Sequence, residues 1–270
     1  MSIVSRLVAT LVATSLVAAT VVAAPLVAAL ATTSPAAAAD IKVLTTGAFK
    51  PIVLETVVPF EKATGHKVEV VNDTAGALVR RVEGGESFDV IVLTPAGLKG
   101  LAEKGRIAAG PPVPLARVGI GVAVATGAPK PDISTVESFK KTLLAANKVA
   151  MIDPASGGSS GIYLMKLFAQ WGVADAVKAK AVLVPGGLVA TKVVSDEADL
   201  AIHQVSEILA VKEAVLVGAL PAEIQNYTVY AGGLSVAPRD PAAATAFLTA
   251  LASPEAAKLL EQKGMLPPGP

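Results

Sequence analysis

The 270-residue chain contains no cysteine, which excludes disulfides, thiolate nucleophiles and cysteine-ligated zinc. Histidine is scarce, with only two residues, His66 and His203, so we expect no metal site. Neither sign of charge dominates, since the chain has 23 basic and 22 acidic residues. Because no basic block is present to neutralise phosphates, we expect no nucleic-acid partner.

Long apolar runs are absent except at the N-terminus. Residues 7–31 are rich in Leu, Val, Ala and Thr and follow a single charge, Arg6. The run leads into SPAAAAD, which fits cleavage between small residues just before Asp40. The run is long enough for an uncleaved membrane anchor, but Pro25 and the cleavage site favour removal. We therefore predict a signal peptide over residues 1–39 and a mature protein in the periplasm.

Apolar strands alternate with helical patterns along the mature chain, which predicts an α/β fold with parallel sheets. Three strands are predicted at 41–44, 67–71 and 89–94, and small or hydroxyl-bearing residues follow each one. Helix N-termini gather at the carboxyl edge of such a sheet, and their free N–H groups attract anions. Local helix capping is the alternative role for the hydroxyls. The candidate anion ligands here are Thr45, Thr46, Gly47, Thr74, Ala75, Gly76 and Thr94.

A second small-residue cluster, DPASGGSSG, follows a strand predicted at 149–152 and precedes a helix predicted from Ile162. Its composition suits an anion, but the lysine of the phosphate-loop motif is missing. We therefore expect neither a nucleotide nor another cofactor. The candidate ligands of this half are Ser159, Ser160 and Gly161, with Gly186 and Gly187 from a later turn.

An enzyme would need a general base. His66 lies in a turn that we expect to be exposed, whereas His203 ends a predicted strand and Glu207 follows shortly after it. A histidine at a strand end is often purely structural, and no Ser-His-Asp spacing is visible. Catalysis therefore stays an alternative to simple binding.

Four phrases, FEKATGHKVEVV, TAGALVRRVEGGESFDVIVLT, LAEKGRI and DPASGGSSGIY, resemble the molybdate-type periplasmic substrate-binding proteins of ABC importers, and the likeness covers essentially the whole mature chain. The resemblance implies a type II periplasmic-binding fold with two three-layer α/β lobes, two crossovers and a ligand in the cleft. The first lobe would comprise 40–115 plus 226–270, and the second 116–225. It also implies a monomer that works with a membrane permease.

In molybdate binders, uncharged hydroxyls and backbone N–H groups hold the anion. The matching positions are Thr45 or Thr46, Thr74, Ser160, the Gly186–Gly187 turn and Gln204. The sequence departs from that family at two of these places. Gln204 stands where a tyrosine is usual, and Asp73 beside Thr74 would oppose a divalent oxyanion unless its carboxylate points away.

The chain also resembles a neighbouring branch that binds organic acids and includes aconitate isomerases. Arg117, at a predicted domain crossover, could supply the guanidinium fork that suits a carboxylate, whereas Arg80 and Arg81 fit a solvated helix face. We therefore predict a small anionic ligand, either a molybdate-like oxyanion or a di- or tricarboxylate. An isomerase of an unsaturated carboxylic acid is the alternative to a binding protein.

Overall fold

The computed structural model describes residues 38–269, so the predicted signal peptide lies outside the described residues except for its last two positions. Ten strands follow one another along this part of the chain. They are β1 (Asp40–Thr46), β2 (Lys67–Asp73), β3 (Val90–Leu93), β4 (Val113–Val118), β5 (Ile120–Ala125), β6 (Val149–Ile152), β7 (Ala181–Val184), β8 (Leu200–Gln204), β9 (Ala214–Ala219) and β10 (Thr228–Leu234).

Helices occupy most of the connections between the strands. They are α1 (Lys50–Thr64), α2 (Ala75–Glu83), α3 (Pro95–Glu103), α4 (Val136–Ala145), α5 (Ser159–Gln170), α6 (Ala174–Lys178), α7 (Thr191–Val194), α8 (Val205–Leu209), α9 (Pro241–Leu251) and α10 (Pro254–Gln262), with short 3-10 turns η1 (Pro154–Ser156) and η2 (Ala222–Ile224). None of the helices within residues 38–269 is long and apolar enough to cross a membrane.

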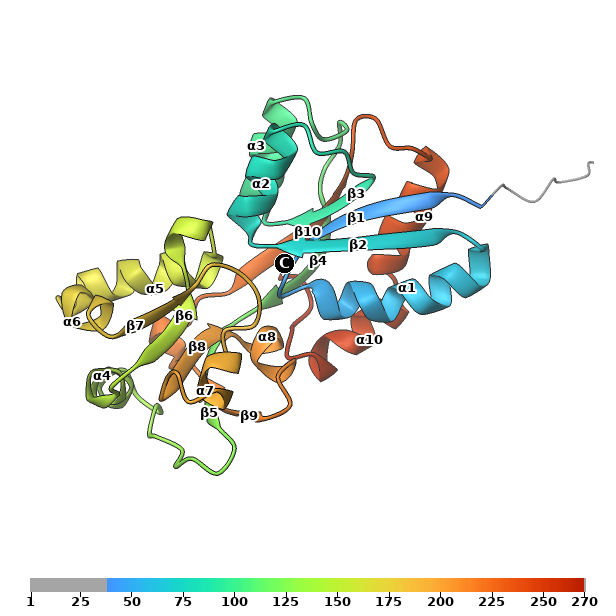
Figure 1. Cartoon of the computed structure of the whole chain (residues 1–270). Coiled ribbons are helices and arrows are strands. Elements are labelled where there is room, and N and C mark those ends of the chain that lie inside the picture. Colours follow the sequence, from blue (N-terminus) through green and yellow to red (C-terminus); the bar gives the residue numbers. More distant parts are fainter. Residues whose placement is uncertain (1–37, 270) are drawn as a thin grey trace, which may run out of the picture. The chain divides into compact units, whose positions relative to one another are not determined.

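The strands form two five-stranded sheets, ordered β2-β1-β3-β10-β4 and β7-β6-β8-β5-β9. In the first sheet β1 pairs in parallel with β2 and β3, and β10 is antiparallel to β3 and β4. In the second sheet β6 pairs in parallel with β7 and β8, and β5 is antiparallel to β8 and β9. Each sheet therefore has a parallel core whose carboxyl edge faces the other lobe (Figure 1).

Each sheet is covered on both faces because its strands are apolar on both sides. On β1, Val43 belongs to the core beneath α1, α9 and α10, while its neighbour Leu44 packs with α2 and α3. In the second sheet Met151 packs with α4 and α5, and the adjacent Ile152 packs with α7 and α8. Alternation along a strand thus produces two three-layer lobes, as the sequence predicted.

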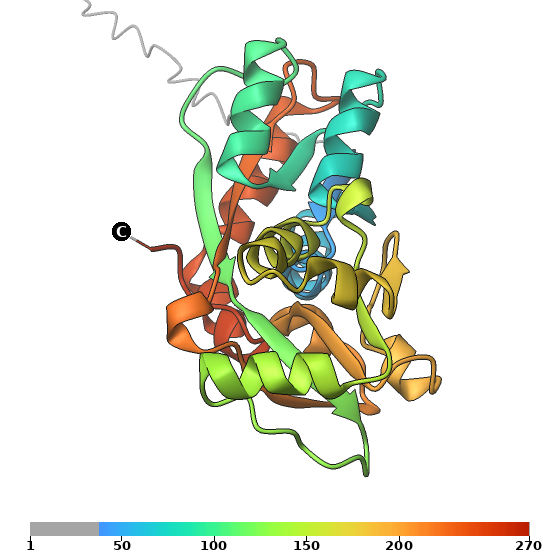
Figure 2. The same cartoon turned by 90° about the vertical axis from the view of Figure 1, so that its left-hand side faces the viewer.

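The chain crosses between the sheets twice, at Gly119 and between β9 and β10, and Figure 2 shows the first crossover as a green ribbon that runs from one sheet into the other. The Gln225 side chain joins the two crossovers, since its Oε1 accepts from Ile120 N at 2.7 Å and its Nε2 donates to Ile120 O at 2.9 Å. A Cβ on Gly119 would lie 3.1 Å from this amide. The lobe limits assigned from the sequence, at 115/116 and 225/226, stay a prediction.

Two details differ from the predicted strands. The sequence predicts one strand over 118–125, but the structure breaks it at Gly119, because β4 pairs with β10 and β5 pairs with β8. It also predicts separate strands at 227–230 and 234–236, whereas β10 is continuous. Its two central glycines, Gly232 and Gly233, leave room for the side chains of Leu248 and Leu98.

Candidate functional site

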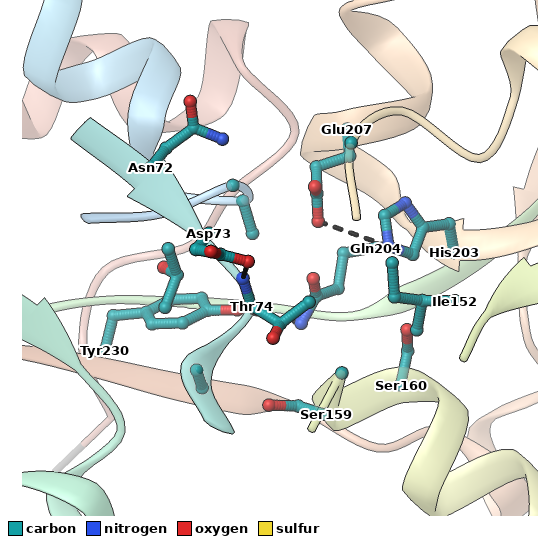
Figure 3. Close-up of a pocket in the computed structure, with 16 residues that line it drawn as sticks. Asn72, Asp73, Thr74, Ile152, Ser159, Ser160, His203, Gln204, Glu207 and Tyr230 are labelled. Carbon is teal, nitrogen blue, oxygen red and sulfur yellow. Dashed lines mark hydrogen bonds and ion pairs between the residues drawn. The ribbon is translucent and has the colours of Figure 1, made fainter. Parts of the chain in front are cut away.

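A small pocket lies where the carboxyl edges of the two sheets face each other, with a cavity of about 30 Å³. That is little more than one or two ordered waters need, so the two lobes are closed on each other. No lysine or arginine is among its lining residues. These residues, drawn in Figure 3, are Thr46, Gly47, Ala48, Asn72, Asp73, Thr74, Ala75, Ile152, Gly158, Ser159, Ser160, Gly187, His203, Gln204, Glu207 and Tyr230.

The first lobe contributes the ends of β1 and β2. Thr74 caps α2 by accepting from Ala77 N at 3.2 Å, and its hydroxyl donates to Ser156 O of the other lobe at 2.5 Å. The carboxylate of Asp73, which precedes the N-cap of α2, accepts hydrogen bonds from Thr74 N at 2.8 Å and from Arg81 Nη1 at 3.3 Å. A positive partner therefore compensates the charge that the sequence places beside Thr74.

The second lobe contributes the N-terminus of α5, a 12-residue helix whose N-cap, Gly158, provides no side-chain cap. A Cβ on Gly158 would lie 2.5 Å from Ile152, so a glycine is needed for the helix to start against the end of β6. The first N–H groups of a helix have no intrahelical acceptor and carry partial positive charge. Ser159 and Ser160 line the pocket at this helix start, which therefore favours an anionic group.

Two strongly perturbed groups of the pocket are His203, at the end of β8, and Glu207 on α8. The imidazole Nε2 lies 3.4 Å from the carboxylate Oε2, and the two side chains are only 2% and 7% exposed. Burial raises the pKa of the Glu207 carboxyl from 4.5 to about 8 and lowers the pKa of the His203 imidazole from 6.5 to about 3. Below about pH 8 the pair therefore carries one proton, on Glu207, and no net charge.

A polar network from a third strand completes the floor. Gln204 Nε2 lies 2.8 Å from the Tyr230 hydroxyl and 3.2 Å from Thr228 Oγ1. Burial, with a smaller contribution from the charge of Glu207, raises the pKa of the Tyr230 phenol. Tyr230 therefore stays a neutral hydrogen-bond donor. It also places a phenol beside Gln204, the residue that stands where the resembled family usually has a tyrosine.

Two hydroxyls of the pocket have no hydrogen-bond partner in the part of the chain that the structure describes, those of Thr46 and Ser160. The two residues are 3% and 0% exposed. Leaving a buried hydroxyl unpaired costs about 1–3 kcal/mol, so folding alone gives no reason to keep them there. Together with the free N-terminus of α5, they mark the face of the pocket that is built for a polar ligand.

The structure brings together part of the residue set predicted from the sequence. Those that line the pocket are Thr46, Gly47, Thr74, Ala75, Ser159, Ser160, Gly187 and Gln204. Those that do not line it are Thr45, Gly76, Thr94, Arg117, Gly161 and Gly186. Contact of any of them with a ligand stays a prediction.

Four of the predicted residues outside the lining have structural partners of their own. Arg117 lies in β4 with its guanidinium 5.1 Å from the centre of the Tyr227 ring, because β4 belongs to the sheet and not to an exposed hinge. Thr94 caps α3 by accepting from Gly97 N at 3.2 Å. Gly76 N donates to Gly157 O at 3.2 Å, and Gly161 packs so closely on Ile152 that a Cβ would overlap its carbonyl oxygen.

Several lining residues were not in the predicted set, and their signals in the sequence differ. His203 and Glu207 are the two groups considered above as candidate bases, and their spacing places both at the junction of β8 with α8. Asn72 directly follows a predicted strand. Tyr230 carries no local signal, because only the pairing of β10 with β3 and β4 brings it below the pocket.

Two α/β lobes with a pocket between facing strand ends define the class of type II periplasmic binding proteins. Within this class, the chain belongs to the family of bacterial extracellular solute-binding proteins, whose sequence profile matches residues 41–266. A curated relative, an aconitate isomerase of a Pseudomonas species, is 36% identical over 233 residues, which are 84% of this chain and 87% of the relative.

Solved structures of other binding proteins share the fold at much lower identity. The periplasmic molybdate-binding protein of Azotobacter vinelandii aligns with a TM-score of 0.68 at 18% identity, covering 85% of this chain and 100% of that chain. The sulfate-binding protein of Mycobacterium tuberculosis aligns with a TM-score of 0.67 at 20% identity, covering 85% and 87%. These two likenesses establish the architecture and not the ligand.

Proposed function

We propose that the chain is an isomerase that binds an unsaturated carboxylic acid of the aconitate type in this pocket and moves a proton along its carbon skeleton. The observation that carries the proposal is the buried His203–Glu207 pair inside the pocket. Binding alone needs no such pair, and the cost of burying a carboxyl group is high. The aconitate isomerase at 36% identity supports the choice of substrate class.

The proposed reaction is a 1,3 shift of a proton across an allylic system. In the fraction of molecules in which Glu207 is ionised, its carboxylate is the base that removes a proton from the methylene group beside the double bond. The electron pair then spreads over three carbons and the attached carboxylate, and Glu207 returns the proton to the other end. A base whose pKa is about 8 is close to the optimum for proton transfer at neutral pH.

Neutral donors stabilise the charge that develops on the substrate. The free N–H groups at the start of α5 and the unpaired Ser160 hydroxyl would hold one carboxylate. The Tyr230 phenol stays protonated because burial raises its pKa. Such donors are fixed before the reaction starts, which is the arrangement that stabilises an enolate-like state in a site closed to water.

The test is an isomerase assay with cis- and trans-aconitate on the purified mature protein, comparing wild type with Glu207→Gln. We expect the variant to lose at least about a hundredfold in kcat, the usual contribution of a general base, while a thermal-shift titration still detects aconitate binding. Glu213→Gln, an exposed glutamate of the same lobe, is the matched control and should keep full activity.

Two outcomes would contradict this proposal in different ways. Full activity of Glu207→Gln would remove the pair from catalysis. Aconitate binding by wild type without any turnover would remove the isomerase and leave a binding protein.

A second function is favoured by one specific observation, the lining without any lysine or arginine. Hydroxyls and helix N–H groups alone suit a molybdate-like oxyanion. In that case the protein, exported by residues 1–39, would be a monomer that delivers its anion to an ABC permease. A thermal-shift panel of molybdate, tungstate, sulfate and the aconitates separates the two functions, since only a bound ligand raises the melting temperature.

A further inference from the structure

A second cavity of about 380 Å³, here called the outer groove, adjoins the inner pocket. The two share four lining residues, Gly47, Asn72, Gly187 and Glu207. Glu207 therefore stands at the junction, with one side toward the inner pocket and the other toward the groove. Gly47 leaves room for its carboxylate there, since a Cβ on Gly47 would overlap Glu207 Oε1.

The walls of the outer groove are mainly apolar, and its charged lining residues are two lysines, Lys50 and Lys263, and two glutamates, Glu55 and Glu207. Pro51 and Leu54 of α1 form one wall, and Leu188 and Ala210 of the second lobe form the other. Of its two lysines, Lys263 is paired with Glu55 at 2.8 Å. No carboxylate forms a salt bridge with Lys50 within residues 38–269.

Lys50 is also fixed in position relative to the catalytic pair. It begins α1, and its backbone N–H donates to Gly47 O at 3.2 Å. The same turn therefore carries both the glycine that touches Glu207 and the lysine that lines the groove. The backbone bond fixes where the Lys50 side chain begins, and an ammonium group beside an apolar groove suits the terminal carboxylate of a short organic acid.

We propose that the outer groove is the subsite for a second, distal carboxylate of the substrate, which Lys50 binds. This inference rests on the proposed function and specifies its substrate as an acid with at least two carboxylates. The inner cavity, of about 30 Å³, leaves space for one small polar group. A substrate anchored at both ends would cross the junction with its middle carbons beside Glu207, which places the acidic C–H of an allylic diacid at the base.

The test compares Lys50→Gln and Lys50→Arg with wild type, using trans-aconitate, with three carboxylates, and crotonate, with one. We expect Lys50→Gln to raise the KM and the dissociation constant for trans-aconitate about tenfold or more, as for loss of a charged hydrogen bond. The dissociation constant for crotonate should change less than twofold, and Lys50→Arg should recover most of the affinity for trans-aconitate. Lys62→Gln, an exposed lysine on the last turn of α1, is the control.

The results separate this inference from the proposed function. Turnover of trans-aconitate with equal KM in wild type and Lys50→Gln would overturn the subsite and leave the isomerase intact. An equal loss for crotonate and trans-aconitate would also overturn it, because Lys50 would then act on the shared carboxylate. A selective loss of trans-aconitate binding without any turnover would support the subsite in a carrier of organic acids.

Discussion

The proton held by the His203–Glu207 pair makes the stability of the protein depend on pH in a way that one substitution should remove. Glu207 has a folded-state pKa of about 8, against 4.5 when exposed. Its contribution to stability is therefore complete below pH 4.5, and it is lost as the pH rises through 8, because the unfolded chain has already released this proton. Glu207→Gln replaces the carboxyl by an amide that does not titrate.

The size of the effect follows from linkage. Between pH 6.5 and pH 9 the protonated Glu207 loses about 2 kcal/mol of stabilisation relative to the amide. His203 in the folded state has a pKa of about 3 and does not titrate in this range, and its titration in the unfolded state is the same in both proteins. The expected difference holds whichever of the two side chains carries the proton, because only the number of bound protons enters.

Urea unfolding of wild type and Glu207→Gln at pH 6.5 and pH 9 measures this difference directly. The free energy of unfolding of wild type, relative to the variant, should fall by about 2 kcal/mol, or about 4–8 °C in melting temperature for a mature chain of this length. Glu213→Gln should give a curve parallel to that of wild type. Parallel curves for Glu207→Gln as well would refute the protonated pair.

Two further substitutions test how the lobes close and how the ligand is held. Gly76→Ala should weaken ligand binding about tenfold, since its Cβ would lie 2.7 Å from Gly157 Cα across the cleft, but it should change the stability of the free protein little, because alanine is favoured in a helix. Calorimetric titration checks this against Gly100→Ala, whose Cβ meets nothing within 4 Å. Equal affinity of the two variants would show that the contact with Gly157 does not control closure. Ser160→Ala should weaken ligand binding severalfold. The free protein should be as stable as wild type or about 1 kcal/mol more stable, because the substitution removes a buried hydroxyl without a partner. A destabilised free protein with unchanged affinity would show that the hydroxyl serves the fold.

The type of fold was predictable because local patterns determine it. Strands such as 149–152 are apolar on both faces, and helix starts such as Thr74 and Thr94 carry capping hydroxyls. Both features act within a few residues. The capping role was considered for these threonines, and the structure shows that both of them cap their helices. The same short-range chemistry placed Ser159 and Ser160 at the start of a helix.

The lining of the pocket was predictable only where it follows directly from a strand end. Thr46 and Thr74 come from the ends of β1 and β2, and they meet because parallel strands bring their carboxyl ends to one edge. Ser160, at the start of α5, joins them from the other lobe. The sequence also offered Arg117 as a carboxylate ligand, but the pairing of β4 with β10 directs its guanidinium to Tyr227. A charged side chain near a crossover has no preferred direction until the sheet is formed.

The sequence by itself determined the α/β class and the small-residue helix starts of the site, because periodicity and capping are properties of neighbouring residues, while the two-lobed arrangement followed from the resemblance to periplasmic binding proteins. Only the tertiary structure decided the chemistry inside the pocket. Burial of His203 and Glu207 against each other shifts both pKa values, and the antiparallel insertion of β10 brings Tyr230 beside Gln204. Desolvation and contacts between residues far apart in the chain depend on the packed lobes, so no local pattern encodes them.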